Sequence, residues 1–188
     1  MTDPPHARRK DAIANEERII AAASELFAER GIDAPIPAIA RRAGVGKATV
    51  YRNFPTKADL IAALAVKRLE AVQESVDRAL AHGDPAEAFS RFTEEVLLMQ
   101  LADHGVGDAL RREMRPEVAS LRRKVVRGIG RVLKRGQDAG VIRHDRTGND
   151  FRLLVSGVAG ELIWLGECSK ATWRRYASLI TDAFWECG

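Results

Sequence analysis

The sequence predicts an all-α protein of about nine helices, and three observations support this fold class. Alternating runs rich in Val, Ile and Thr, which mark β-strands, are almost absent. Apolar residues recur at helical spacing along most of the 188 residues. Glycine, proline and capping residues separate these segments, as expected where helices begin and end.

The first helix is expected to begin near Asn15, a good N-cap, and to end before Gly31. Glu16 and Glu17 fall in its first turn, where the helix dipole favours acidic side chains. Its apolar stripe consists of Ile19, Ile20, Ala23 and Phe27. The preceding residues 1–14 contain a basic cluster with no apolar run behind it, so we expect a disordered basic arm rather than a secretory signal.

Two short helices are expected next, joined by a glycine-containing turn. Pro35 and Pro37 precede the second helix, which extends to about Ala43 and is ended by Gly44. Gly46 can cap a third helix over about residues 47–53. Two helices joined in this way form a helix-turn-helix, whose second helix enters the major groove of DNA.

The rest of the chain reads as six further helices. Phe54-Pro55 ends the third helix, because proline disfavours helical geometry in the residue before it. Thr56 and Asp59 form a capping-box pattern for a long fourth helix that reaches about Ala81. The remaining expected helices cover residues 85–102, 106–112, 116–138 and 147–165, and the last runs from Ser169 through Cys187.

The third helix carries the side chains that DNA contact requires. Lys47, together with Lys57 at the start of the fourth helix, supplies positive charge for phosphates. Thr49, Tyr51 and Arg52 offer hydroxyl and guanidinium donors from the exposed face. Val50 and Phe54 should point the other way and hold the helix against its neighbours.

The run from Ile19 to Leu64 resembles the DNA-binding head of the TetR family of transcriptional regulators. The matching pattern comprises Ala22-Ala23, Leu26-Phe27, Gly31, Ile39-Ala40, Ala43-Gly44-Val45, Thr49, Tyr51, Phe54, Lys57 and Leu60. The resemblance implies a helix-turn-helix domain over residues 15–55. It also implies a helical effector-binding and dimerisation domain over residues 56–188.

The resemblance also assigns roles on the DNA-binding face. It implies phosphate contacts by Tyr51 and Lys57, and groove contacts by some of Lys47, Ala48, Thr49 and Arg52. The chain departs from the family pattern in two places. Pro35 and Pro37 stand near the start of the second helix, where the family often has Thr, and Gly46 stands where it often has Ser.

The last two helices are expected to form a homodimer interface. The helix over 147–165 is apolar nearly all round, so it should be buried on more than one side. The resemblance implies a four-helix interface made by these two helices from each subunit, although some of their side chains must belong to the intramolecular core. The residues expected at the interface are Phe151, Val155, Gly157, Gly160, Trp173, Ala177, Ile180 and Phe184.

The family also implies a pocket for a small-molecule effector within the body. Candidate lining residues are Phe89, Phe92, Met99, Glu161 and Trp164, although an aromatic or Met on an apolar stripe more often belongs to the core. Glu161 lies within an apolar helix and needs a partner, which could be an Arg, solvent or a ligand.

Positive charge is concentrated in one segment of the body. Residues 111–135 hold ten Lys or Arg against two Glu, whereas the whole chain carries a net charge of +4. The simplest interpretation is a solvated helix face. The alternative is affinity for an acidic ligand, an acidic protein or flanking DNA.

No catalytic constellation is evident, so we expect no enzyme activity, no cofactor and no metal site. The chain also lacks an apolar run of the roughly 18 residues that suggest a membrane span. With only two cysteines, a cytoplasmic location is the simplest inference. The most consistent function is a homodimeric regulator, a repressor, that binds a near-palindromic operator and is released by an effector. A DNA-binding protein without an effector and a protein-interaction module remain alternatives.

Overall fold

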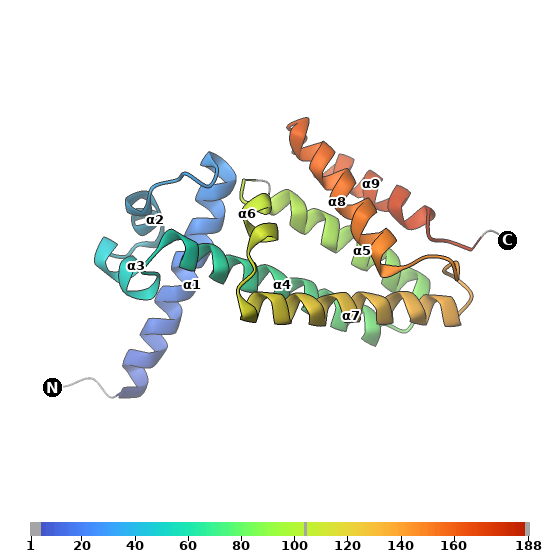
Figure 1. Cartoon of the computed structure of the whole chain (residues 1–188), viewed down its shortest axis with the longest axis horizontal. Helices are drawn as coiled ribbons and strands as arrows, with labels where there is room; N and C mark the ends of the chain where they lie inside the picture. The colour runs from blue at the N-terminus through green and yellow to red at the C-terminus, as the bar shows by residue number, and fades with distance from the viewer. Residues whose placement is uncertain (1–4, 104, 187–188) are drawn as a thin grey trace. The chain divides into compact units, whose positions relative to one another are not determined.

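The computed structural model describes residues 5–103 and 105–186, with side chains from Ala12 onward (Figure 1). Within these ranges the protein forms helices and one isolated antiparallel bridge between Ile142 and Trp185. The helices are α1 (Pro5–Arg30), α2 (Ile36–Ala43), α3 (Lys47–Asn53), α4 (Lys57–Ala81), α5 (Pro85–Ala102), α6 (Gly107–Arg112), α7 (Pro116–Asp138), α8 (Gly148–Trp164) and α9 (Lys170–Asp182). The all-α prediction is therefore confirmed.

Two helix ends differ from the prediction. Helix α1 begins at Pro5 rather than near Asn15, so residues 5–14 of the expected disordered arm are helical; residues 1–4 lie outside the described residues. A proline in the first turn of a helix is well tolerated, and no glycine interrupts the turns that follow. Helix α9 ends at Asp182, whereas the sequence predicts a helix through Cys187, which also lies outside the described residues.

The chain divides into two compact units. One contains Met1–Val66 and Gly105–Arg115, and the other contains Lys67–His104 and Pro116–Gly188. The sequence predicts a boundary between residues 55 and 56. The observed unit instead keeps the first turns of α4 and gains α6, and we call it the head; the other unit is the body.

The head is built around the buried face of α1. Helix α2 packs against both α1 and α3, and Ile19, Phe27, Ile39 and Val50 are fully buried. The backbone at Gly105 lies directly on α1, because a Cβ added there would be 1.7 Å from the carbonyl oxygen of Phe27. This close approach explains why the segment around α6 belongs to the head.

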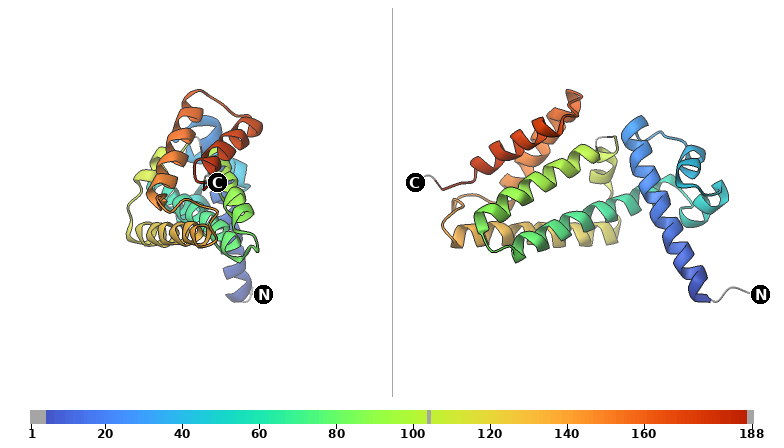
Figure 2. Two further views of the ribbon diagram at one scale, coloured as in Figure 1. Left: turned by 90° about the vertical axis from the view of Figure 1, so that its right-hand side faces the viewer. Right: turned by 180° about the vertical axis from the view of Figure 1, so that it is seen from behind.

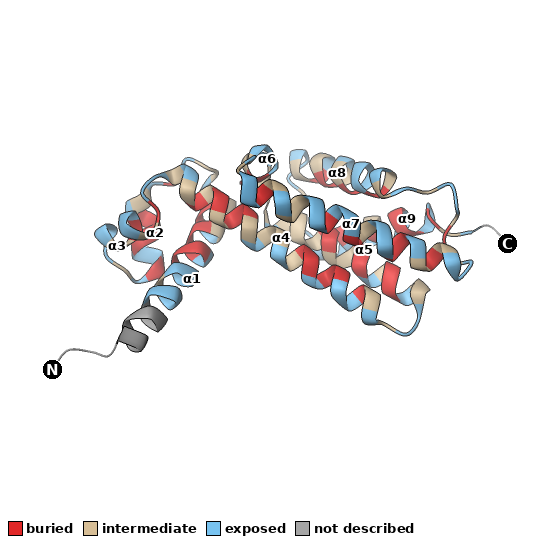
Figure 3. Cartoon of the chain, turned by 60° about the horizontal axis from the view of Figure 1, so that its bottom comes forward, coloured by how far each residue is buried: buried red, intermediate tan, exposed pale blue. Residues whose placement is uncertain are grey.

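The body is organised around α5, which packs against α7, α8 and most extensively α9 (Figure 2, right). Five aromatic rings meet in its core with centroid separations of 5.3–6.0 Å. They belong to Phe89, Phe92, Phe151, Phe184 and Trp185. Figure 3 shows how buried and exposed positions alternate along the helices around this core.

We expect Gly105→Ala to lower the free energy of unfolding of the head by about 1–3 kcal/mol, as overpacking does in a well-packed site. Gly130→Ala is the matched control, because a Cβ at this position in α7 meets no atom within 4 Å. It should stabilise the protein by about 0.5–1 kcal/mol through helix propensity. Urea unfolding followed by circular dichroism measures both. Equal stability of the two variants would contradict the close packing of Gly105 on α1.

Candidate nucleic-acid interface

A left-handed glycine sets the turn between α2 and α3. Gly44 has φ 66° and ψ 32°, and its N–H donates to the carbonyl of Arg41 over 3.2 Å. The N–H of Val45 donates to the carbonyl of Ala40 over 3.0 Å, which closes the end of α2. Residues with a Cβ rarely adopt this left-handed backbone conformation, so glycine at this position lets the chain reverse into α3.

An ion-pair cluster fixes α2 on α1. The Arg42 guanidinium donates to the carboxylates of Glu25 and Glu29 over 2.9 Å. These hydrogen bonds raise the pKa of Arg42, and the same contact lowers the pKa of Glu29. The pairs are exposed and individually weak, but together they orient α2 relative to α1.

The buried side of α3 determines which residues face outward. Val50 is fully buried and Phe54, just after the helix, is also buried, while the Asn53 amide donates to the carbonyl of Thr49 over 2.8 Å. The opposite side is therefore open to solvent. It carries Lys47, Ala48, Tyr51 and Arg52, which are all exposed, and Thr49, which is half-buried.

Lys47 and Tyr51 form a pair on this face. They are one helical turn apart, and the Lys47 ammonium lies 5.6 Å from the centroid of the Tyr51 ring. Tyr51 remains 42% exposed, so both groups are available to a partner. The structure thus gathers the five residues predicted on α3 onto one short helix, with a cation, hydroxyls and a guanidinium on its solvent side.

Lys57, the sixth predicted residue, lies on the first turn of α4. Its ammonium is 5.6 Å from the centroid of the Phe27 ring. The capping box is present: the Thr56 N–H donates to Asp59 over 2.8 Å, and the Asp59 N–H donates to the Thr56 hydroxyl over 3.2 Å. Hydrogen bonds from Thr56 and the nearby Arg115 guanidinium, 2.9 Å away, hold the pKa of Asp59 below its usual value.

The two departures from the family pattern are visible at the helix starts. Pro35 and Gly46 occupy the N-cap positions of α2 and α3, and neither makes a side-chain capping hydrogen bond. These two helices are therefore held by packing and by the Arg42 cluster rather than by their own caps.

The predicted dimer interface requires correction. Six of its residues are at most 4% exposed in a single chain, so little of their surface remains for a second subunit. They are Phe151, Val155, Trp173, Ala177, Ile180 and Phe184. The sequence pattern could not separate the two sides of a helix that is apolar nearly all round.

The open side of α8 carries a different set of residues. Leu153, Gly157, Gly160 and Trp164 follow one another at spacings of four, three and four residues, on the side of α8 away from its buried positions. Leu153 is 53% exposed and Trp164 is 78% exposed, and a Cβ at either glycine would meet no atom within 4 Å. We call these four residues the α8 stripe. Leu153 was missed by the sequence analysis, although a comparison of opposite helix faces would have found it.

The predicted effector-pocket residues do not come together. Phe89 and Phe92 fill the aromatic core and Met99 packs partly against it, whereas Glu161 and Trp164 are exposed. The prediction of a common pocket is wrong for Glu161 and Trp164, because both lie on the outer side of α8. Glu161 faces solvent and makes no ion pair within the described chain.

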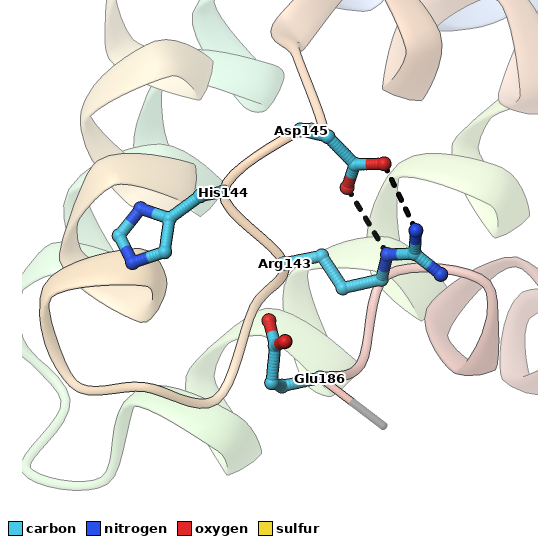
Figure 4. A pocket seen from close by; sticks show the side chains of 4 residues that line it. All are labelled: Arg143, His144, Asp145 and Glu186. Atoms are coloured by element: carbon cyan, nitrogen blue, oxygen red, sulfur yellow. Dashed lines mark hydrogen bonds and ion pairs between the residues drawn. The ribbon is translucent and has the colours of Figure 1, made fainter. Parts of the chain in front are cut away.

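An open hollow of about 390 Å³ lies elsewhere in the body, lined by Arg143, His144, Asp145 and Glu186 (Figure 4). The Arg143 guanidinium makes two hydrogen bonds to Asp145, of 3.0 and 2.9 Å. The lining is polar and carries charged side chains, which does not suit an apolar ligand.

Among the described residues of the body, two side-chain polar atoms stand out because they are buried without a hydrogen-bond partner. They are Nη1 of Arg68 and Oε1 of Gln73, both on α4. The Nε of Arg68 is paired with Asp103, so only part of the guanidinium is satisfied. Burial lowers the pKa of Arg68, and the Asp103 carboxylate opposes this effect.

The residues described include no group of three or more His, Cys, Asp or Glu that could hold a metal ion. Within the same residues, every helix is too short or too polar to pass through a lipid bilayer.

Comparisons with known proteins agree with this geometry. Residues 19–64 match the family described as bacterial regulatory proteins, tetR family. Residues 84–181 match a domain described as the C-terminal domain of SbtR-like transcriptional regulators. An HTH-type transcriptional regulator of Staphylococcus aureus is 45% identical over 53 residues, which cover 28% of this chain and 29% of that protein.

Solved structures resemble most of the chain. A TetR transcriptional regulator from Streptomyces coelicolor is 32% identical, with a TM-score of 0.70, over 92% of this chain and 99% of its own. A TetR transcription regulatory protein from Mycobacterium vanbaalenii is 29% identical, with a TM-score of 0.71, over 95% of this chain and 99% of its own. The helix-turn-helix geometry and these matches together show that the chain belongs to the TetR family of DNA-binding transcriptional regulators.

Proposed function

We propose that this regulator is a homodimeric repressor that binds a near-palindromic operator through α3 and releases it when a small molecule occupies the body. The observation that carries the proposal is the outward face of α3, where Lys47, Tyr51 and Arg52 are exposed while Val50 anchors the helix from behind. Such a regulator would act in the cytoplasm, where its operator lies.

The contacts with DNA divide by chemistry. Lys47 and Arg52 can donate to phosphates or to guanine edges, and the hydroxyls of Thr49 and Tyr51 can serve either target. Ala48, exposed between them, can make an apolar contact with a thymine methyl group. Lys57 on α4 supplies a further phosphate contact.

The α8 stripe supports the homodimer. Two exposed large apolar side chains, Leu153 and Trp164, flank two glycines that leave room for a close helix crossing. Leu179 on α9 adds another exposed apolar side chain. A second copy of this surface would cover all of them, and a dimer can place two α3 helices on half-sites about one DNA turn apart.

The buried, unpartnered atoms of Arg68 and Gln73 support an effector site along α4. An unpaired buried polar group costs about 1–3 kcal/mol, and a ligand that supplies the missing partner recovers this energy. The spare Arg68 N–H favours an acidic group, and the Gln73 oxygen accepts a hydrogen bond. We therefore propose an effector that carries a carboxylate or a similar anion.

We expect Lys47→Ala and Tyr51→Ala each to weaken binding to operator DNA by about 10–100-fold, because each removes a contact from the exposed face of α3. Fluorescence anisotropy with a duplex selected by the wild-type protein from a random library measures the affinity. Lys67→Ala removes an exposed cation from the body and serves as the control. Unchanged affinity in both α3 variants, with normal helicity, would remove α3 from the interface.

We expect Gly160→Trp to convert the dimer into a folded monomer. The single chain has room for the new side chain, since a Cβ at Gly160 meets nothing within 4 Å. A partner helix that crosses closely at Gly160 would clash with the tryptophan. Gly130→Trp makes the same change at an equally open glycine on α7 and should remain dimeric. Sedimentation velocity distinguishes the species. A normal dimer for Gly160→Trp would place the interface elsewhere.

We expect an acidic effector to raise the melting temperature of the wild-type protein and to release operator DNA. At a ligand concentration of 100 times Kd the stabilisation is about 2.7 kcal/mol. Arg68→Lys keeps the charge opposite Asp103 but removes the Nη1 nitrogen that lacks a partner, so this variant should fold and lose most of the response. A thermal-shift screen of small carboxylates and their amides tests both points. Equal responses to acids and amides would refute the anionic class.

A further inference from the structure

The exposed face of α7 carries four cations without partners. Arg123, Lys124, Arg127 and Arg131 are exposed, and none of them makes a hydrogen bond or ion pair within the described chain. We call them the α7 cation row. Between Glu117 and Asp138 the helix contains no acidic residue at all.

Packing fixes the direction of this row. The opposite side of α7 is buried through Val118, Val125, Val132 and Leu133. A Cβ at Gly128 would lie 2.7 Å from a methyl carbon of Val76, so this side of α7 packs closely against α4. The cation row therefore faces solvent, as the exposed positions along α7 in Figure 3 indicate.

Elsewhere in the body, exposed cations are mostly neutralised by acids. Lys67 pairs with Glu70, Arg78 with Glu95, Arg91 with Glu87, and Arg174 with Glu94. The α7 cation row differs from these four cations because none of its members has an acidic partner within the described chain. Clustered like charges repel one another, and an anionic partner would relieve the repulsion.

We propose that the α7 cation row binds the sugar-phosphate backbone of duplex DNA without sequence preference, as a second contact surface separate from α3. The four cations extend over nine residues, from Arg123 to Arg131, or about 12 Å of helix, which is one charge per about 3–4 Å. One strand of duplex DNA presents one phosphate charge per about 3.4 Å of axis. The charge densities of the two surfaces therefore match.

The composition of the face favours this occupant over two others. Docking on a membrane surface uses large apolar side chains beside the cations, and a stable protein interface has an apolar centre. Val126, 51% exposed, is the one large apolar side chain among the strongly exposed residues of α7. DNA needs neither, because cations alone provide non-specific affinity.

The experiment uses the full-length chain with α3 silenced by Lys47→Ala, Tyr51→Ala and Arg52→Ala. The probe is a 40-base-pair duplex of random sequence, titrated between 50 and 200 mM salt. Four phosphate contacts per chain correspond to a slope of log affinity against log salt of about −3.6, or about a 10²-fold loss over this range. Further changes Arg123→Gln, Lys124→Gln, Arg127→Gln and Arg131→Gln should abolish this residual binding.

The matched control carries Lys67→Gln, Arg78→Gln, Arg91→Gln and Arg174→Gln on the same background. The control also loses four positive charges from the body, but these four cations are already paired with acids. Its salt slope should change by less than about one. Equal losses in both quartets, or a loss in neither, would overturn the proposal.

Two further measurements keep the outcome decisive. Circular dichroism checks folding. If the quadruple change unfolds the chain, the double variant Arg123→Gln with Arg127→Gln should still reduce the salt slope by about two.

Vesicles containing phosphatidylserine test the alternative of a lipid surface. If the four α7 substitutions abolish binding to the vesicles but leave binding to DNA unchanged, the surface is assigned to lipid instead. Because α3 is silenced throughout, the result is independent of operator recognition.

Discussion

The packing around Phe27 is the constraint on which the DNA-binding head depends. Its side chain is fully buried on α1, its ring lies beneath the ammonium of Lys57, and its carbonyl oxygen lies against the backbone of Gly105. Three segments that are distant in sequence therefore meet at one residue: α1, the start of α4 and the loop before α6. The position of Lys57 follows directly from this packing.

Each of the three surfaces proposed to bind a partner is the reverse side of a well-buried helix face. Val50 and Phe54 turn the cation and the hydroxyls of α3 outward, and the valines of α7 do the same for its arginines. On α8, Phe151 and Val155 occupy the aromatic core, which leaves glycine, leucine and tryptophan on the open side. Specific burial thus determines three surfaces of different chemistry: mixed polar, cationic and apolar.

The sequence predicts most helix ends because the signals there are local. Gly44, Pro55 and the Thr147–Asp150 capping box act through their own backbone geometry or hydrogen bonds, and the structure contains each of them. The outward face of α3 was also predictable, since its motif combines buried and exposed positions over a few residues. The assignment of Phe151 and Trp173 to a dimer interface failed because apolarity alone does not tell which neighbour covers a side chain. The packing of Gly105 on Phe27 joins residues 78 positions apart, and no local pattern signals it.

Both ends of α4 are tied down by arginines from other parts of the chain. Arg115 binds Asp59 at the first turn. At the other end, Arg135 donates to the carbonyl of Ala79 over 2.8 Å and, just beyond the helix, to the carbonyl of Gly83 over 3.0 Å. The final carbonyls of a helix normally have no partner within it, so this arrangement opposes fraying where unravelling usually starts. The 25 residues of α4, which belong partly to the head and partly to the body, are consequently protected against unravelling from either end.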